Sequence, residues 1–290
     1  MLLPAVGSVL RTLLVTLALV FALRLAPTAD GATYRLIGAG DVAGCSWTAD
    51  TASGDLIRAR PGATVWTAGD NAYERGTLAE FNNCYGPAWG SFKGRTKPTP
   101  GNHEYLTLGA SGYFTYFPVR SYYTYKIGAN WRIYALNSNI AHGVGSAQYK
   151  WLRHKLAAYP RPCIIAIWHH PLFSSGRPGN HPSLEPFWDL LYAAKAELVL
   201  NGHTHAYERF AKMRANGTRD WRGLREVVVG TGGARLVAWG AIHPLSRARN
   251  NSDHGVLRIR LNDDLKRYDA RFLPIAGKTY SDRFGSRCSP

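Results

Sequence analysis

The sequence predicts an α/β fold, in which strands and helices form the layers of one domain. After an apolar leader, short strand-like apolar runs alternate with stretches of helical spacing, the pattern of mixed layered domains. The chain has 290 residues, of which 46% are hydrophobic and 19% charged, enough apolar material for a large buried core. It has no heptad run and no fixed glycine period, which excludes coiled coils and collagen-like proteins.

The first element, residues 1–32, is predicted to be a signal peptide or an amino-terminal membrane anchor. An uninterrupted apolar run at 12–23 lies between Arg11 and Arg24. It is shorter than the roughly 20 residues of a membrane span and fits the about 7 to 15 residues of a signal-peptide core. We therefore expect export, to the surface, the periplasm or the medium, with a retained anchor as the alternative.

Residues 33–290 are expected to form one domain, because no linker or repeat divides them. Short runs of apolar and β-branched residues predict strands at 34–39, 64–68, 131–137, 163–168, 198–200, 226–229, 256–261 and 268–273. A helix is predicted at 146–158, where Tyr149, Leu152 and Leu156 recur at helical spacing. Another is predicted at 183–196, with Ser183 as N-cap and Pro186 in the first turn.

Five of the predicted strands run directly into short polar sequences. These are Gly-Asp-Val-Ala-Gly at 40–44, Gly-Asp-Asn-Ala-Tyr at 69–73, Asn-Ser-Asn at 137–139, His-His-Pro at 169–171 and Asn-Gly-His-Thr-His at 201–205. A further cluster, Gly-Asn-His-Glu at 101–104, is expected in a loop. Because ligand sites of such folds gather at the carboxyl ends of strands, these clusters are expected to lie close together.

The side chains of these clusters are an inventory of metal ligands. Carboxylate, phenolate, amide and imidazole donors favour iron, zinc or manganese, and the absence of a C-x-x-C spacing argues against a thiolate site. The number of donors suits two metal ions. The candidate ligands are Asp41, Asp70, Tyr73, Asn102, His169, His203 and His205.

The order of these motifs resembles the purple acid phosphatases, which are calcineurin-like metallophosphoesterases. The family pattern is Gly-Asp-x-Gly, Gly-Asp-x-x-Tyr, Gly-Asn-His-(Glu/Asp), Val-x-x-His and Gly-His-x-His, and the second, third and fifth motifs are unaltered here. The fourth has Ala166 for Val, and the first carries one extra residue before Gly44. The resemblance extends from Tyr34 to the carboxyl terminus and is greatest to the short bacterial-type members.

The resemblance implies a calcineurin-like metallophosphoesterase fold, two mixed β-sheets packed face to face and flanked by helices. It also implies two metal ions, Fe(III) with a divalent Fe, Zn or Mn, and Asp70 as the ligand that bridges them. Many other metallophosphoesterases have Asp-x-His in the first motif, whereas this chain has Ala43, and Tyr73 fits that vacancy and favours iron. The implied ligands are Asp41, Tyr73 and His205 for the ferric ion, and Asn102, His169 and His203 for the divalent ion.

The implied activity is hydrolysis of small-molecule phosphomonoesters by attack of a metal-bound hydroxide. His103 and then His181 are the candidate proton donors to the leaving group. His170 is expected to be structural. The alternatives are a phosphodiesterase or nuclease with the same dimetal centre, and a catalytically silent metal-binding or anion-binding surface protein.

The net charge of +16 should attract anionic ligands such as phosphates, but it does not select one. The basic residues are scattered and do not line one helix, so we expect no dedicated nucleic-acid reader. A membrane partner is expected only if the leader is retained, and the oligomeric state is open.

The four cysteines are too few for a disulfide scaffold, but they can pair in an exported protein. Three connectivities are possible. We expect Cys45 to pair with Cys84, because each falls in a loop shortly after a candidate metal motif.

Overall fold

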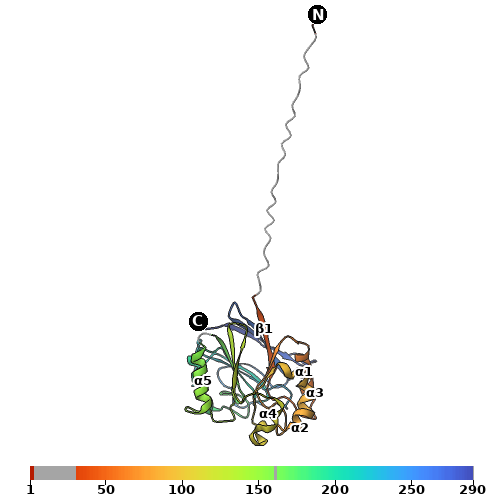
Figure 1. Ribbon diagram of the computed structural model, residues 1–290, viewed down its shortest axis with the longest axis vertical. Helices are drawn as coiled ribbons and strands as arrows, with labels where there is room; N and C mark the ends of the chain where they lie inside the picture. Colours follow the sequence, from red (N-terminus) through yellow and green to blue (C-terminus); the bar gives the residue numbers. More distant parts are fainter. Residues whose placement is uncertain (3–30, 160–161, 290) are drawn as a thin grey trace. The chain divides into compact units, whose positions relative to one another are not determined.

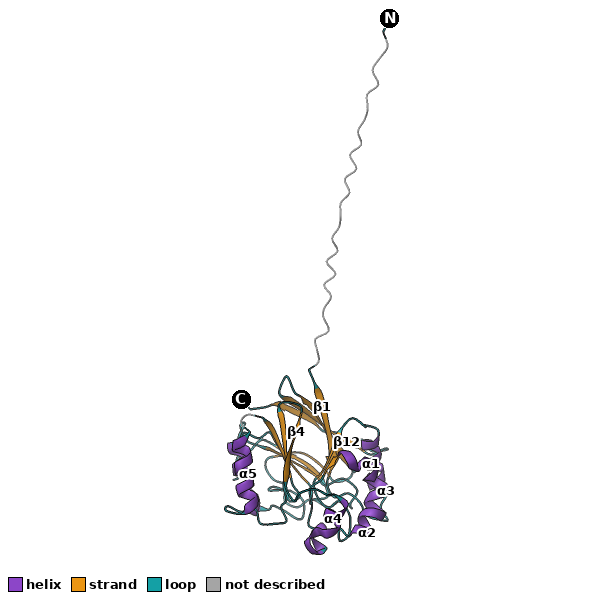
Figure 2. Ribbon diagram, in the orientation of Figure 1, coloured by secondary structure: helices purple, strands orange, loops and turns teal. Residues whose placement is uncertain are grey.

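Two mixed β-sheets form the centre of the protein in the computed structural model, which describes residues 1–2, 31–159 and 162–289. Figure 2 shows the strands between helices. The predicted leader lies almost wholly outside these residues, so its cleavage or retention stays a prediction. Within the described ranges, no helix is long and apolar enough to cross a membrane.

The first sheet has six strands in the order β13-β12-β11-β1-β2-β3. The bounds are β1 (Thr33–Ala39), β2 (Thr64–Thr67), β3 (Thr96–Lys97), β11 (Gly255–Asn262), β12 (Arg267–Pro274) and β13 (Arg283–Arg287). Strands β1, β2 and β3 are parallel, and β11, β12 and β13 continue the sheet in antiparallel pairing. The parallel pairing brings the carboxyl ends of β1 and β2 to the same edge.

The second sheet has seven strands in the order β10-β8-β9-β7-β6-β5-β4. The bounds are β4 (Tyr123–Ile127), β5 (Trp131–Ala135), β6 (Cys163–Ile167), β7 (Leu198–Asn201), β8 (Tyr207–Phe210), β9 (Arg225–Val229) and β10 (Ser246–Asn250). Its central strands β5, β6, β7 and β9 are parallel. The carboxyl ends of β6 and β7, which lead into the two histidine motifs, therefore also lie at one edge.

The main core lies between the two sheets. Ile133 and Ile165 of the second sheet belong to the same buried cluster as Leu257 of the first. The neighbouring Tyr134 and Ala166 point to the opposite face and belong to a second cluster. Because side chains alternate along a strand, the central strands are buried on both faces and appear in the sequence as continuous apolar runs.

Helices flank the sheets on opposite sides, as Figure 1 shows for α5 and for α1 with α3. Leu152 of α5 and Phe187 and Trp188 of α6 belong to the core cluster on the outer face of the second sheet. The helix bounds are α1 (Ala49–Arg58), α2 (Leu78–Glu80), α3 (Gly86–Trp89), α4 (Ser111–Tyr116), α5 (Ala147–Ala158) and α6 (Glu185–Ala193). This arrangement of two mixed sheets and flanking helices confirms the predicted fold class.

The predicted elements are present, but several boundaries differ: the strand predicted at 131–137 ends at Ala135, and the helix predicted at 183–196 spans Glu185–Ala193. Helix α5 begins as predicted, because the Ser146 hydroxyl accepts a hydrogen bond from the Tyr149 amide. Helix α6 begins at Glu185, after a single 3-10 turn at Pro182–Leu184, and Leu184 occupies the N-cap position without a side-chain bond. The prediction that Ser183 caps this helix was wrong. Pro186 has no backbone N–H for an α-helical bond to the Pro182 carbonyl, which instead accepts the Glu185 amide of the 3-10 turn.

All four cysteines are paired in disulfides. Cys45 is bonded to Cys84, which confirms the predicted pair, and Cys163 is bonded to Cys288. The second bond connects β6 of one sheet to the segment after β13 of the other.

Candidate metal centre

Asp41, Asp70, His169 and His203 follow the ends of β1, β2, β6 and β7, respectively. Three of these residues have left-handed backbones, with φ of 59° at Asp41, 48° at Asp70 and 68° at His203. Such angles are uncommon for residues other than glycine, and aspartate tolerates them better than most. They turn the chain sharply at the strand ends, so that the side chains converge.

One group of donor atoms surrounds the Tyr73 phenol. Its Oη lies 3.1 Å from Asp41 Oδ1, 3.1 Å from Asp70 Oδ2 and 3.1 Å from His205 Nε2. His205 Nε2 is itself 3.3 Å from Asp41 Oδ1. Four side chains from three separate segments of the chain therefore direct oxygen or nitrogen atoms at one point.

A second group surrounds the Asn102 amide. Asn102 Oδ1 lies 2.9 Å from His169 Nε2 and 3.0 Å from His203 Nδ1, and these two ring nitrogens are 3.2 Å apart. Asp70 Oδ2 is 3.2 Å from His169 Nε2. The Asp70 carboxylate thus touches both groups, and all seven predicted ligand residues lie together.

Backbone carbonyls set the orientation of two imidazoles. His169 Nδ1 donates a hydrogen bond to Ala68 O at 2.7 Å, and His205 Nδ1 donates to Arg235 O at 2.9 Å, because a carbonyl can only accept. In its neutral form, each ring therefore presents an unprotonated Nε2 to the donor group in front of it. Metal-binding histidines commonly use their second nitrogen in this way.

The charges at the centre also fit a cation. Asp41 and Asp70 are both fully or almost fully buried, at 0% and 1% exposure. Burial and the negative charges of Asp70 and Asp41 raise the pKa of the Tyr73 phenol well above its ordinary value. A phenolate at this point requires a positive charge beside it, and a multivalent metal ion supplies one.

The two candidate proton donors lie at the borders of the donor groups. His103 Nε2 is 3.9 Å from Asp70 Oδ2, and its side chain is 25% exposed. The His181 ring centroid lies 4.9 Å from that of His203, and its Nε2 is shielded from solvent with no hydrogen-bond partner among the described residues. The centre is therefore partly open to solvent at His103.

His170 was expected to be structural, because a strand that continued through it would direct its side chain away from that of His169. It lies beside the centre instead. Strand β6 ends at Ile167, so the alternation does not continue to this residue. The His170 ring centroid is 4.4 Å from that of His203, and its Nδ1 is 2.8 Å from the Ser138 hydroxyl.

Glu104 holds two of the motifs together, a role that sequence analysis missed. Its buried carboxylate accepts hydrogen bonds from the backbone amides of Gly101, Asp70, Asn71 and Ala72, at 2.6 to 3.2 Å. Gly101 is required at this contact, because a Cβ there would lie 2.1 Å from Asp70 Oδ1. The Glu at the end of Gly-Asn-His-Glu was a signal for this role, but the sequence does not show what it binds.

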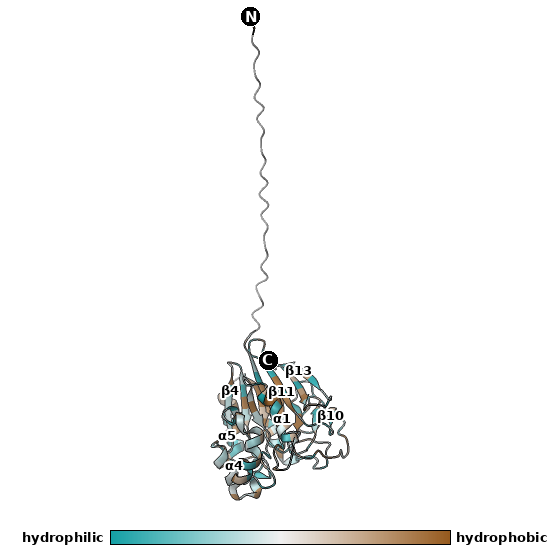
Figure 3. Ribbon diagram, turned by 90° about the vertical axis from the view of Figure 1, so that its right-hand side faces the viewer, coloured by the Kyte–Doolittle hydropathy of each residue, from teal (hydrophilic) through white to brown (hydrophobic). Residues whose placement is uncertain are grey.

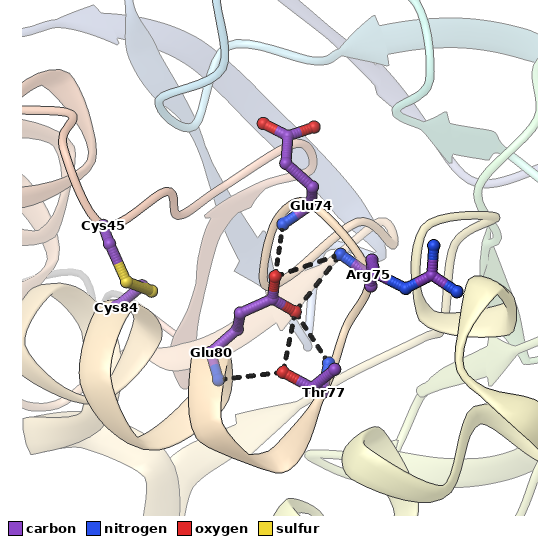
Figure 4. The surroundings of a disulfide bond; sticks show 6 residues. All are labelled: Cys45, Glu74, Arg75, Thr77, Glu80 and Cys84. Carbon is purple, nitrogen blue, oxygen red and sulfur yellow. Dashed lines mark hydrogen bonds between the residues drawn. A yellow bond between two sulfur atoms is a disulfide. The ribbon is translucent and has the colours of Figure 1, made fainter.

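A second carboxylate, Glu80, orders the chain that follows Tyr73, as Figure 4 shows. It accepts hydrogen bonds from the Glu74 amide at 2.7 Å and the Thr77 amide at 2.8 Å. The Glu74 carbonyl in turn accepts the Nδ1–H of His103 at 2.6 Å. The Cys45–Cys84 disulfide lies in the same region, and it ties the loop after Asp41 to the segment after Glu80.

Two further buried carboxylates hold the loop between His169 and His181. Glu226 accepts the amides of Leu172 and Phe173, and Glu208 accepts the amide of Ser175 at 2.8 Å. Because this loop ends at His181, these bonds fix the backbone from which that imidazole reaches the centre.

Comparison with known proteins agrees with this geometry. The family model described as calcineurin-like phosphoesterase matches residues 34–207, a range that contains every residue of both donor groups. Purple acid phosphatase 22 of Arabidopsis thaliana is 25% identical over 273 residues, which cover 82% of this chain and 60% of that protein. The resemblance to purple acid phosphatases is thereby confirmed, although the chain spans only about 60% of the length of this relative.

Solved structures share the fold. Purple acid phosphatase PPD1 from yellow lupin (Lupinus luteus) aligns with a TM-score of 0.71 over 89% of this chain and 54% of that chain, at 19% identity. GAP50, described as the anchor in the inner membrane complex of Plasmodium, aligns with a TM-score of 0.71 over 89% of this chain and 90% of that one, at 13% identity. At such identities the likeness concerns the fold alone, whereas the family match extends over most of the chain. The chain belongs to the calcineurin-like phosphoesterase family.

Proposed function

We propose that this protein is an exported phosphatase that hydrolyses phosphomonoesters at a centre of two metal ions. The observation that carries the proposal is the contact of Asp70 with both donor groups. Asp41, Tyr73 and His205 would hold one ion, Asn102, His169 and His203 would hold the other, and Asp70 would bridge them. The phenolate favours iron at the first position, with a divalent iron, zinc or manganese at the second.

Hydrogen bonds within the protein hold the candidate ligands in orientations suited to metal binding. His169 and His205 are held in the orientation that presents Nε2, so binding requires little rearrangement. Glu104 fixes the backbone on both sides of Asp70, which keeps the bridging carboxylate between the groups. When bound, two such cations supply the Lewis acidity that activates a water and stabilises the phosphate oxygens.

His103 is the first candidate for the proton that the leaving oxygen needs. Its Nδ1 donates to the Glu74 carbonyl, so only a protonated ring carries a hydrogen at Nε2, the atom that faces the centre. The His181 ring lies beside that of His203, its Nε2 has no hydrogen-bond partner among the described residues, and it is the second candidate. Both atoms can hold a proton within reach of a leaving group at the centre.

The test compares hydrolysis of an aryl phosphomonoester and its diester by wild type, Asp70→Asn and a matched control, Asp189→Asn. Asp189 is exposed on α6, so its loss leaves the centre intact. We expect Asp70→Asn to lose metal and to lose more than the roughly 10- to 100-fold in activity that removal of an outer-shell partner costs. The bound metal is measured by elemental analysis of the purified proteins.

The other outcomes assign the chain to a different class. Preference for the diester, with activity that falls steeply with salt, would make it a phosphodiesterase or nuclease. Metal uptake without turnover on either substrate would make it a binding protein. Near-normal activity of Asp70→Asn would remove the bridging role.

A further inference from the structure

A row of arginines crosses the outer face of the first sheet, away from the core. Leu257, Ile259 and Leu261 of β11 belong to the core between the sheets, so Arg258 and Arg260 point to the opposite face. On β12 the same alternation places Arg271 on this face, since Ala270 and Phe272 are buried in the core.

The strand register places these arginines directly beside one another. Arg258 is opposite Arg271, and Arg271 is opposite Arg283 of β13. Arg260 is opposite Arg35 of β1. Like charges at directly opposed positions of antiparallel strands destabilise the pairing, so the bare arrangement costs folding free energy.

Little negative charge offsets this cluster among the described residues. Asp269 lies opposite Arg260 and lines the groove, but its Oδ1 is bonded to Arg267 at 2.9 Å. The Nε of Arg258 is shielded from solvent and has no hydrogen-bond partner in the described part of the chain. Burial and the positive charges of Arg60, Arg260, Arg271 and Arg35 lower the pKa of the Arg258 guanidinium.

We propose that this arginine groove is a binding site for a compact soluble anion that carries several phosphate groups. Arg258, Arg260, Arg271 and Arg283 line a groove of about 510 Å³. Neighbouring strands are about 4.8 Å apart, so the backbones of Arg258, Arg271 and Arg283 span only about 10 Å. This size fits a small polyanion, and the guanidinium groups offer it paired hydrogen bonds as well as charge.

The groove is separate from the metal centre. Its arginines lie within strands and project from the outer face, whereas the donor groups follow the ends of strands. No arginine of the groove contacts a candidate metal ligand in any hydrogen bond or ion pair of the described residues. The bound anion is therefore a ligand and not a substrate, and the proposal goes beyond hydrolysis at the centre.

The test measures binding of inositol hexasulfate by calorimetry, since its sulfate esters are not phosphatase substrates. The metal-loaded protein is compared with a groove variant, Arg258→Gln/Arg271→Gln/Arg283→Gln, at about 150 mM salt, where long-range attraction is screened. A control variant, Arg153→Gln/Arg219→Gln/Arg247→Gln, removes the same number of charges at exposed positions outside the groove. We expect the groove variant to weaken binding at least tenfold, and the control variant and Asp70→Asn to change it less than twofold.

Three results would overturn the proposal. Equal weakening in the groove and control variants would show attraction by net charge alone, and loss of binding in Asp70→Asn would place the probe at the metal centre. The ligand would be a membrane if the wild-type protein, but not the groove variant, sedimented with phosphatidylglycerol vesicles and inositol hexasulfate did not compete. If the triple variant does not fold, Arg271→Gln alone keeps the comparison valid, because half-buried Arg271 is directly opposite two other arginines.

Discussion

At the scale of single residues, Tyr73 is the candidate ligand that distinguishes the proposed centre, because its phenol lies between two buried carboxylates. We expect Tyr73→Phe to abolish the visible charge-transfer band of the iron-loaded protein, since that band requires a phenolate ligand. Absorption spectra of folded variants measure this. Tyr85→Phe is the control, because Tyr85 is also buried but belongs to the core. A band that persists in Tyr73→Phe would reject phenolate ligation.

His103 gives a second prediction, which depends on the leaving group. If His103 Nε2 donates a proton, His103→Ala should slow alkyl phosphates by about 10² and aryl phosphates with good leaving groups much less. Ratios of kcat/KM for the two substrate types measure the effect. His154→Ala, at an exposed position on α5, is the matched control. Equal losses on both substrates would argue against proton donation, and the same assay of His181→Ala would then test the second candidate.

The candidate ligands could be named from the sequence, whereas the residues that support them could not. Asp41 and His203 were identified because each follows an apolar strand in a short polar motif, and the structure brings them together as expected. Glu104 and Glu80 were not assigned a role, because their partners are backbone amides, which have no signature in the sequence. The type of a side chain indicates whether it can bind a metal. Which backbone amides a carboxylate will bind depends on how the chain folds, and the sequence does not show this.

At the scale of elements, the disulfide between Cys163 and Cys288 connects the two sheets and closes a long loop. The bonded residues are 125 positions apart, and such a loop implies about 4 to 5 kcal/mol of stabilisation in the chain-entropy model. We expect Cys163→Ser/Cys288→Ser to lower the free energy of unfolding by an amount of this order and to leave metal binding in the folded fraction. Urea titration measures the first quantity and elemental analysis the second.

The control for this prediction is wild type treated with an alkylating reagent but no reductant. Its mass and its unfolding midpoint should not change, because both cysteine pairs are already bonded. Labelling without reductant, or an unchanged stability of the double variant, would contradict the disulfide's stabilising role.

Strands were predicted from the sequence where burial of both faces makes them continuous apolar runs. The strands at 163–168 and 198–200 are apolar because both their faces are covered, and they were located within one or two residues. Strand β10 was missed, since its sequence Ser-Arg-Ala-Arg-Asn exposes arginines and resembles a loop. Short helices such as α3 depend on tertiary contacts, among them the Trp89 indole that donates to Asp50 O.

At the scale of the whole molecule, the pairing of the strands is the feature that local patterns could not predict. Strand β1 lies between β11 and β2 in the first sheet, although β11 is more distant in sequence than the entire second sheet. Hydropathy indicates which runs are buried but not which runs are neighbours. The two-sheet arrangement was expected only through the resemblance of the metal motifs. In Figure 3 both β11 and β13 carry hydrophilic positions, which fits one exposed face at this end of the sheet.

The stability of the whole molecule should depend on pH through Glu226. This side chain is fully buried on β9, and burial together with the charge of Glu208 raises its pKa to about 8, from an ordinary 4.5. Between these values the folded protein retains a proton that the unfolded chain releases. The contribution of protonated Glu226 to the free energy of unfolding is therefore complete below about pH 4.5. It decreases as the pH rises toward 8, by up to about 1.4 kcal/mol per pH unit.

Glu226→Gln separates this contribution from all other titrating groups, because an amide has no proton to lose over this range. Its side-chain oxygen can still accept an amide from the loop at 172–173, so the fold should persist. We expect the urea midpoint to fall less between pH 5 and pH 8 in Glu226→Gln than in wild type, while Glu185→Gln, at an exposed position on α6, follows wild type. Parallel curves for all three proteins would mean that Glu226 is ionised in the folded state, with its two backbone donors outweighing the cost of burial.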